Sequence, residues 1–434
     1  MQSDTLPKAS PLMAVGQIVG VNVLVNRFDA MVRHREWAYV GTRVWERNLR
    51  LGWAWDEDAF ATNVFAHPYN GSMYFNAGRA NGLSFFESVP LSLLGSWSWE
   101  YFAETERPSL NDFLMTGAGG IALGEMFYRI GTTIRDNTAT GTSRTLRELA
   151  ALPFDPMGGL NRLARGQWKG IGINPATHDP KAFVLRTGAG MRFAKGLVTD
   201  SVARMGTIVS DLSYGDQFAG PYRTPFDVFS IRLVLSSQGK GLNLLAATGR
   251  LYGHDLNDST SQFRHQLAVN QRYDYINNPA QSYGTQSVEI GIDSRWRIGP
   301  VGQKGGFGLR TSVFLDGIIL GAIDAPGTGV GSRDYDFGPG GGVRWEAGVD
   351  RHGARFLVLH GRVEYIHTVS GAAADHLVNL SGIELTIPVT NSLGVAAQTN
   401  IFDRESHYTD RRADRRDYPE ARILLLWTKA GSKP

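Results

Sequence analysis

The chain has 434 residues, a length at which two or more domains are expected. Hydrophobic residues make up 42% of it and charged residues 20%, a balance that excludes an intrinsically disordered chain. The net charge of +3 gives no basis for nucleic-acid binding, and the absence of cysteine excludes disulfides, thiol catalysis and cysteine metal sites.

The first apolar stretch runs from Leu12 to Val25 and follows Lys8. Gln17 and Asn22 interrupt it and no small-residue cleavage site follows, so it lacks the pattern of a secretory signal peptide. An exported protein needs such a signal. We therefore expect either that the signal has been removed or that the start of the chain is atypical.

The segment 63–79 contains the next polar residues of interest, Asn63, His67 and Arg79. His67 precedes Pro68, and a residue before proline is disfavoured in the helical region of backbone space. The sequence therefore predicts an extended or turn conformation at His67. Arg79 lies among glycine, alanine and asparagine, which would let a partner approach its side chain closely.

Two capped helices are predicted next. Ser84 and Glu87 form an S-x-x-E capping box that opens a helix ending near Glu104. After a short turn, Ser109 caps a second helix, with Asp112 as its acidic partner. Each helix carries small or acidic residues at every fourth position: Ser88, Ser92, Ser96, Glu100 and Glu104 on the first, and Asp112, Thr116, Gly120, Gly124 and Tyr128 on the second.

Facing ridges of small residues predict a close helical hairpin. In such a hairpin Glu100 and Glu104 lie near Asp112, and Glu125 pairs with Arg129 one turn on. The first helix is long enough to raise an inner-membrane alternative, but its internal proline, serines and glutamates make it a poor membrane anchor. We expect the hairpin to pack at the mouth of the domain that follows, or partly within it.

From Ala182 onward, polar and apolar residues alternate along long stretches. In the segment 283–298, for example, Glu289 and Asp293 share one face and Ile290 lies on the other. Twelve strands are predicted, near 182–195, 205–217, 226–237, 241–254, 262–275, 283–298, 305–319, 340–350, 355–369, 376–389, 393–404 and 420–428. The glycine-rich segment 324–341 is expected to be a connector, and the charged run 410–417 a solvated loop.

These strands are longer than those of a soluble β-sandwich, and aromatic residues gather near their ends as at a membrane interface. Their polar face interleaves arginines with acidic residues, which predicts a lumen filled by ion pairs rather than an open pore. An even strand number suits a closed bacterial barrel. We therefore predict a mainly β fold: an antiparallel transmembrane β-barrel of about twelve strands at 166–434, preceded by an α-helical module at 1–165.

Five short motifs follow one another in the helical module. They read N-x-x-x-H-P-x-x-G-S-x-Y at 63–74, A-G-R-x-x-G at 77–82, W-E-Y-x-x-E at 99–104, P-S-x-N-D at 108–112 and G-G-x-x-x-G-E at 119–125. In order and spacing they resemble an uncharacterised bacterial family, a domain of unknown function found in predicted outer-membrane proteins. The resemblance implies an outer-membrane location and supplies no established activity. Across the barrel it extends to the architecture alone.

The motifs place several ionisable residues in one apolar hairpin. We take His67, Glu100 and Asp112 as candidate catalytic residues, because burial and like charge raise carboxyl pKa values and a histidine beside them could act as a general base. An enzyme of this kind would be a lipid-directed hydrolase or acyltransferase. The candidate ligand-binding residues are Asn63, Arg79, Glu104, Glu125 and Arg129.

Other interpretations of these residues stay open. Arg79 could bind an anionic headgroup, and the carboxylates could hold a divalent cation, although no cofactor is indicated with certainty. Capping and an ordinary helical ion pair also explain several of them. Three functions follow: a barrel whose helices bind or process a lipid or small-molecule ligand of the envelope, a substrate-specific channel plugged by the helices, and a non-catalytic envelope scaffold. Outer-membrane lipids are the expected partners and nucleic acid is not.

Overall fold

The computed structural model describes residues 9–174, 182–195, 202–218, 222–237, 240–257, 262–278, 281–298, 307–325, 333–351 and 354–431. The chain divides into two compact units, Met1–Pro180 and Lys181–Pro434. The sequence placed the boundary between the two domains earlier, between residues 165 and 166.

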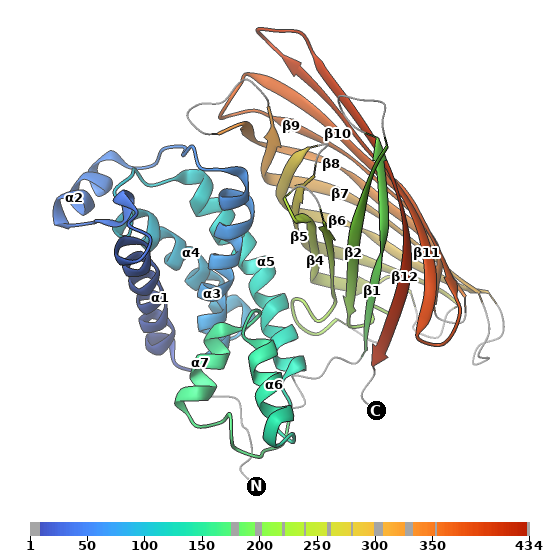
Figure 1. Ribbon diagram of the computed structural model, residues 1–434, viewed down its shortest axis with the longest axis horizontal. Coiled ribbons are helices and arrows are strands. Elements are labelled where there is room, and N and C mark those ends of the chain that lie inside the picture. The colour runs from blue at the N-terminus through green and yellow to red at the C-terminus, as the bar shows by residue number, and fades with distance from the viewer. Residues whose placement is uncertain are drawn as a thin grey trace. The chain divides into compact units, whose positions relative to one another are not determined.

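The first unit is helical in the part that the structure describes (Figure 1). Its elements are α1 (Pro11–Met31), η1 (Glu36–Ala38), α2 (Thr42–Leu51), η2 (Thr62–Ala66), α3 (His67–Ala80), α4 (Phe85–Phe102), α5 (Leu110–Ile134), α6 (Gly141–Ala151) and α7 (Pro156–Ala164).

The caps of the two predicted helices explain where α4 and α5 begin. Ser84 and Glu87 form the complete capping box, with Glu87 N donating to Ser84 Oγ and Ser84 N donating to Glu87 Oε2. Ser109 Oγ accepts from Asp112 N in the same way. The acidic partner of this second cap is not Asp112 as predicted. Ser109 N donates instead to Glu100 Oε2 of α4, at 2.8 Å.

Helix α3 was not predicted from the sequence. His67 is its first residue and has a helical backbone, φ −60° and ψ −51°, so the expected extended or turn conformation is wrong. The π-helical turn η2 ends at Ala66, two residues before Pro68, which has no N–H to donate to the helical ladder. Pro68 itself occupies the first turn of α3, where a missing donor costs least.

Helices α3 and α5 approach each other closely through glycine. A Cβ atom at Gly71 would lie 2.0 Å from the backbone oxygen of Thr116, and one at Gly120 would lie 2.5 Å from the carbonyl carbon of Gly71. The predicted small-residue ridge of α5 therefore packs on α3 as well as on α4, where Ser92 Oγ donates to Gly117 O at 3.1 Å.

We expect Gly71→Ala to destabilise the helical unit by about 1–3 kcal/mol, because the added methyl group forces α3 and α5 apart. Thermal unfolding followed by the helical circular-dichroism signal measures the change. Gly20→Ala in exposed α1, where a Cβ would meet nothing within 4 Å, is the matched control and should be neutral or slightly stabilising. Equal destabilisation by the two substitutions would contradict this account of the crossing.

Helix α1 is long and apolar enough to cross a membrane by length and composition. One of its faces packs within the helical unit, where Ala14 and Ile18 join a buried cluster with Tyr74. On the same face Asn22 accepts a hydrogen bond from the Tyr74 hydroxyl and donates to Ser98 Oγ at 3.0 Å. The opposite face exposes Leu12, Leu24 and Met31.

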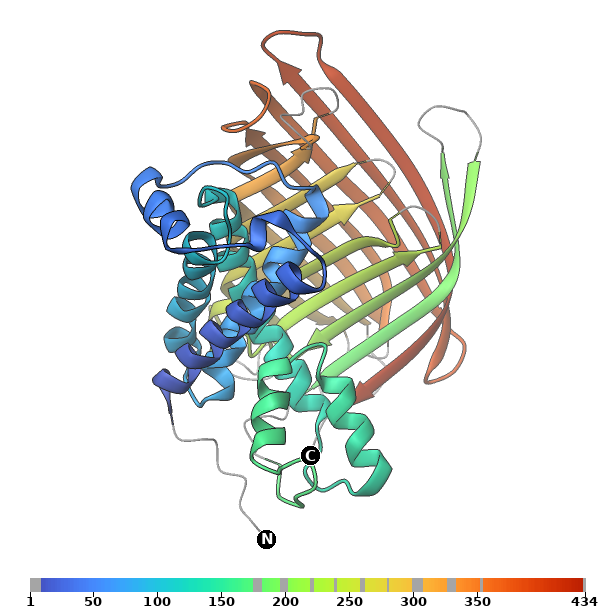
Figure 2. The ribbon, with the colours of Figure 1, turned by 60° about the vertical axis from the view of Figure 1, so that its left-hand side comes forward.

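The second unit is a closed barrel of twelve antiparallel strands, as predicted (Figure 2). Each strand pairs with its neighbours in sequence, and β1 pairs with β12 to close the barrel. The strands are β1 (Phe183–Lys195), β2 (Val202–Tyr214), β3 (Phe229–Ser236), β4 (Leu242–Asp255), β5 (Phe263–Asn277), β6 (Ser282–Ile298), β7 (Phe307–Asp324), β8 (Tyr335–Arg351), β9 (Ala354–His367), β10 (Ala374–Pro388), β11 (Leu393–Tyr408) and β12 (Asp414–Gly431).

Two predicted loops are partly strand. The residues 335–339, predicted as part of a connector, belong to β8, and a Cβ at Gly338 would lie 1.7 Å from His367 O of β9. The charged run 410–417 ends in β12, which begins at Asp414. The residues 410–413 form an exposed loop, as predicted, whereas Asp414 in β12 accepts hydrogen bonds from Arg404 and Arg416.

The barrel is apolar outside and polar inside. Along β6, Ile290 is 50% exposed, whereas Glu289 is fully buried. Inside, Arg344 pairs with Glu289 at 2.5 Å, and Arg272 pairs with both Asp316 and Glu364. The lumen is therefore crowded with ion pairs, as the interleaved charges predicted.

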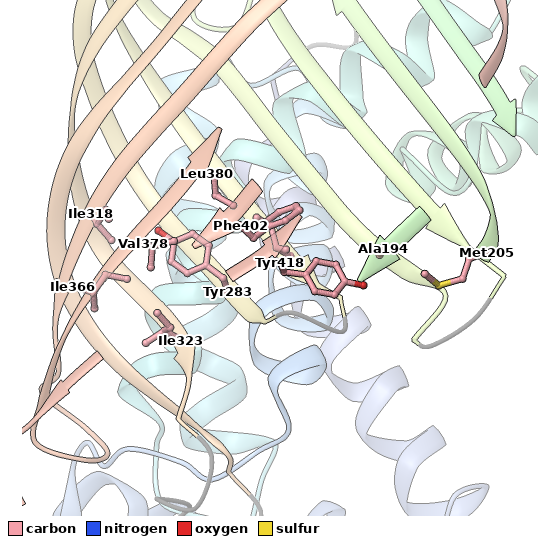
Figure 3. Packing of buried hydrophobic residues seen from close by; sticks show 11 residues of the cluster. Ala194, Met205, Tyr283, Ile318, Ile323, Ile366, Val378, Leu380, Phe402 and Tyr418 are labelled. Carbon is pink, nitrogen blue, oxygen red and sulfur yellow. The ribbon is translucent and has the colours of Figure 1, made fainter. Parts of the chain in front are cut away.

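Apolar side chains form a second interior layer near the strand ends joined by the β1–β2, β5–β6 and β9–β10 connections (Figure 3). Tyr283, Phe402 and Tyr418 supply its aromatic rings. The Tyr283 hydroxyl donates to Glu364, which links this layer to the ion pairs.

Candidate functional site

Three predicted site residues from three helices meet in the helical unit. One ligating atom each of His67, Glu100 and Asp112 lies within 4.8 Å of the other two. His67 begins α3, Glu100 lies in the last turn of α4, and Asp112 lies in the first turn of α5. We call these three residues the His67 group. Its members come together because the caps of α4 and α5 fix the hairpin and the glycine crossing holds α3 against it.

Each member of the His67 group has one side-chain atom held by a neighbour. His67 Nδ1 lies 3.1 Å from Thr116 Oγ1, and its Nε2 lies 3.6 Å from Asp112 Oδ2. In the tautomer that donates from Nδ1 to Thr116, Nε2 presents its lone pair toward Asp112. Glu100 Oε2 accepts from Ser109 N, and Asp112 Oδ1 accepts from Asn111 Nδ2 at 2.9 Å.

Asp56 and Asn111 extend the group, and neither was chosen from the sequence. Asp56 Oδ1 accepts from Asn111 Nδ2 at 2.7 Å and from Asn63 Nδ2 at 2.8 Å. Asn63, a predicted ligand-binding residue, therefore borders the His67 group through Asp56. The N-D pair of the P-S-x-N-D motif was the available signal for Asn111, whereas nothing in the acidic turn at 56–58 distinguished Asp56 from its neighbours.

Burial decides the ionisation of this region. Burial raises the pKa of Glu100 well above its ordinary value, and the nearby Glu104 raises it further. Burial likewise raises the pKa of Asp112, with Asp56 as the second cause. Burial lowers the pKa of His67, so its imidazole is neutral at pH 7. The pKa of Glu104 rises to about 8 for the same reason.

Three other predicted ligand residues form a separate ion-pair cluster, which we call the Arg79 cluster: Arg79, Glu125 and Arg129. Arg79 Nε and Arg129 Nε each lie 2.8 Å from a carboxylate oxygen of buried Glu125. Arg79 also donates to Leu83 O at 2.6 Å and stacks over the Tyr128 ring. Arg79 follows the start of α3 by twelve residues, which at the helical rise is roughly 18 Å. The structure therefore divides the expected single polar site into two.

Glu104 lies at the edge of the His67 group. Its Oε1 accepts from Trp99 Nε1, and its backbone oxygen accepts from Asn48 Nδ2 at 3.3 Å. Neither Glu100 nor Glu104 forms an ion pair with an arginine among the described residues.

Comparisons with known proteins cover the two units separately. Residues 52–157 match a family model described as Domain of unknown function (DUF3943), a range that contains the His67 group and the Arg79 cluster. A search of curated proteins returned no match.

Solved structures similar to the chain are β-barrels. A NanC porin is 10% identical, with 56% of this chain and 98% of that chain covered and a TM-score of 0.29. The Pseudomonas putida toluene transporter TodX is 8% identical, with 58% and 89% covered and a TM-score of 0.23. OprD of Pseudomonas aeruginosa is 10% identical, with 57% and 95% covered and a TM-score of 0.19. These values are too low to transfer a ligand or a transport activity. The chain thus joins a segment similar to a domain of unknown function to a closed twelve-stranded β-barrel.

Proposed function

We propose that this is an outer-membrane protein whose barrel is a non-conducting anchor and whose helical unit binds a ligand of the cell envelope at the His67 group. The observation that carries the first part is the inverted polarity of the barrel. Large apolar side chains are exposed on its outside while charged ones are buried inside, the reverse of a water-soluble protein.

The outer surface of the barrel carries exposed apolar side chains around its circumference, which supports a lipid environment. Exposed aliphatic and aromatic residues occur on strands far apart in sequence, and no soluble monomer leaves so large an apolar surface in water. They include Ile208, Ile290, Leu315, Val343, Val363, Ile383, Val395 and Leu425, with Trp345 and Trp427 among the aromatics.

The interior supports an anchor rather than a pore. Arg272 and Arg362 bridge acidic residues of three strands, β5, β7 and β9. Arg192 pairs with Glu420 at 2.6 Å and is fully buried. Together with the apolar layer of Tyr283 and its neighbours, these pairs fill the cross-section that a porin would leave to water.

The helical unit supports ligand binding at the His67 group more than at the Arg79 cluster. Arg79 and Arg129 already neutralise Glu125, so their donors are engaged within the protein. Exposed apolar side chains on α1 and α4, such as Leu24 and Phe86, favour a lipid as the ligand.

A covalent hydrolase or acyltransferase mechanism has less support than binding. Thr116 supplies the hydroxyl nearest His67, and it is 2% exposed in the middle of α5. A nucleophile must reach its substrate, whereas this hydroxyl serves to orient the imidazole.

Conductance in planar bilayers tests the anchor. The full chain should insert without a steady open-channel current, because the ion pairs and the apolar layer occupy the lumen. A steady current through the wild-type protein would overturn this part and favour the plugged-channel alternative. Recovery of the protein in inner-membrane or soluble fractions would overturn the location.

Mass spectrometry of co-purifying lipids tests the ligand. His67→Ala and Glu100→Ala should each reduce a bound species that the wild-type protein and the exposed control Glu106→Gln retain. Identical lipid profiles in all four folded proteins would remove the ligand-binding part and leave the scaffold alternative.

A further inference from the structure

The buried carboxyl groups of the helical unit fall into two sets: those that pair with an arginine and those that do not. Four of them pair with arginine, and the nitrogen–oxygen distances are short. Asp29 pairs with Arg33 at 2.8 Å, Glu125 with Arg79 and Arg129 at 2.8 Å, Glu148 with Arg162 at 2.8 Å, and Asp155 with Arg135 at 2.5 Å. Within the described residues, Glu100 and Asp112 form no ion pair with arginine or lysine, although they are 1% and 2% exposed.

His67 does not supply the missing charge. Its Nε2 lies 3.6 Å from Asp112 Oδ2, beyond a good hydrogen bond. Two buried carboxyl groups and an imidazole therefore stand together, and among the described residues no arginine or lysine pairs with either carboxyl group. Buried charges in proteins are paired with an opposite charge or bind a metal.

One oxygen of Glu100 is also left without a partner. Glu100 Oε2 accepts from Ser109 N, but the buried Oε1 accepts no hydrogen bond from any residue that the structure describes. This oxygen is therefore available to accept a bond from a cation or another ligand.

We propose that the His67 group binds one divalent first-row transition-metal ion, through His67 Nε2, Glu100 Oε1 and Asp112 Oδ2. The two carboxylates neutralise the ion, and the imidazole favours zinc, iron or manganese over calcium and magnesium, which prefer oxygen ligands alone. The ligating atoms lie within 4.8 Å of one another. Atoms about 2.0–2.2 Å from one ion lie roughly 3–4 Å apart, so metal binding would draw the three side chains together by roughly 1 Å.

The surroundings of the three ligands fit this proposal. Each ligand has its other polar atom fixed by a neighbour: Thr116 holds Nδ1 of His67, the Ser109 backbone holds Oε2 of Glu100, and Asn111 holds Oδ1 of Asp112. Such outer contacts orient the ligands of metal sites and set the basicity of a ligating histidine. Capping alone does not require all three.

Three protein ligands leave a coordination position for water or another ligand, as in catalytic rather than structural zinc sites. This inference deepens the proposed ligand binding at the His67 group and rests on it for its biological role. The ion itself rests on the charge balance of the helical unit. Its binding can therefore be tested without knowing the envelope ligand.

Metal binding by the purified, chelator-treated full chain in detergent provides the test. Isothermal titration should show one equivalent of Zn²⁺ or Mn²⁺ and no comparable site for Ca²⁺ or Mg²⁺. Glu100→Gln and Asp112→Asn should weaken Zn²⁺ binding at least about 100-fold, and Thr116→Val about 10–100-fold. Glu106→Gln, an exposed change near the same hairpin, should bind as the wild type does.

Cu²⁺ spectroscopy identifies the ligands without relying on the stability of a variant. The wild-type protein loaded with one equivalent should show hyperfine coupling to one imidazole nitrogen, and His67→Gln should lose it. No stoichiometric Zn²⁺ or Mn²⁺ binding to the wild type, or unchanged binding in both Glu100→Gln and Asp112→Asn, would overturn the proposal. An altered lipid profile in His67→Ala together with no metal binding would leave the proposed function standing and remove the ion alone.

Discussion

Replacing Arg272 by methionine should destabilise the barrel by about 3–5 kcal/mol, because it leaves a group of buried carboxylates without their cation. Arg272 is 2% exposed and lies 3.2 Å from Asp274 Oδ2 and 2.5 Å from Asp316 Oδ2, and it also pairs with Glu364. Methionine keeps most of the volume, so the loss is one of charge rather than of packing. Denaturant unfolding in lipid vesicles measures the change.

Arg415→Met is the control for this experiment. Arg415 also forms an ion pair, with Asp403 at 3.4 Å, but its side chain is 72% exposed. Solvent-exposed pairs contribute about 0–1 kcal/mol, so this variant should unfold almost as the wild type does. If both variants lost the same stability, the interior ion pairs would stabilise the barrel no more than an exposed ion pair does.

The barrel was predictable because period-two alternation over long strands has few other structural solutions. The strand prediction failed at glycine, because glycine has no side chain from which polar and apolar alternation can be recognised. Gly338 continues β8 because the backbone of β9 lies against it, a contact that no one-dimensional pattern reveals. The start of β12 was missed for the opposite reason, since the consecutive residues Asp414 and Arg415 place charged side chains on both faces of the strand end.

The helical hairpin was predictable from its caps, and the His67 group only in part. The spacing of Ser109, Asp112 and Glu100 follows from local rules that hold wherever the hairpin lies. The sequence placed His67 near them but predicted the wrong backbone conformation for it. A residue before proline favours extended structure, and the π-helical turn η2 is a tertiary feature that the sequence pattern does not show.

The separation of the two polar clusters could not be predicted without knowing that α3 is a helix. Because α3 is a helix, the twelve residues from His67 to Arg79 place Arg79 near the other end of α3, next to Glu125 of α5. The sequence presented His67 and Arg79 as neighbours in one run of motifs. Distance along a helix, not proximity in sequence, decides which charges can meet.

The same substitution should have opposite effects at two buried glutamates of the helical unit. Glu148→Gln removes a fully buried carboxylate that lies 3.1 Å from Arg144, 2.8 Å from Arg162 and 3.4 Å from Arg135. It leaves buried guanidinium groups without a counter-charge, so we expect a loss of about 3–5 kcal/mol. Glu100→Gln replaces a buried carboxyl group that pairs with no cation among the described residues and whose pKa is raised by burial, so in metal-free protein we expect no loss or a small gain in stability.

Zinc should reverse the order of wild type and Glu100→Gln. An ion that binds only the folded protein adds about 2.7 kcal/mol at one hundred times its dissociation constant, and the wild type should gain this while Glu100→Gln does not. Chemical unfolding of the full chain, followed by the helical circular-dichroism signal with and without Zn²⁺, measures all four values. A large loss in metal-free Glu100→Gln would mean that the carboxylate is already balanced by the protein. The His67 group would then be a structural network rather than a metal site.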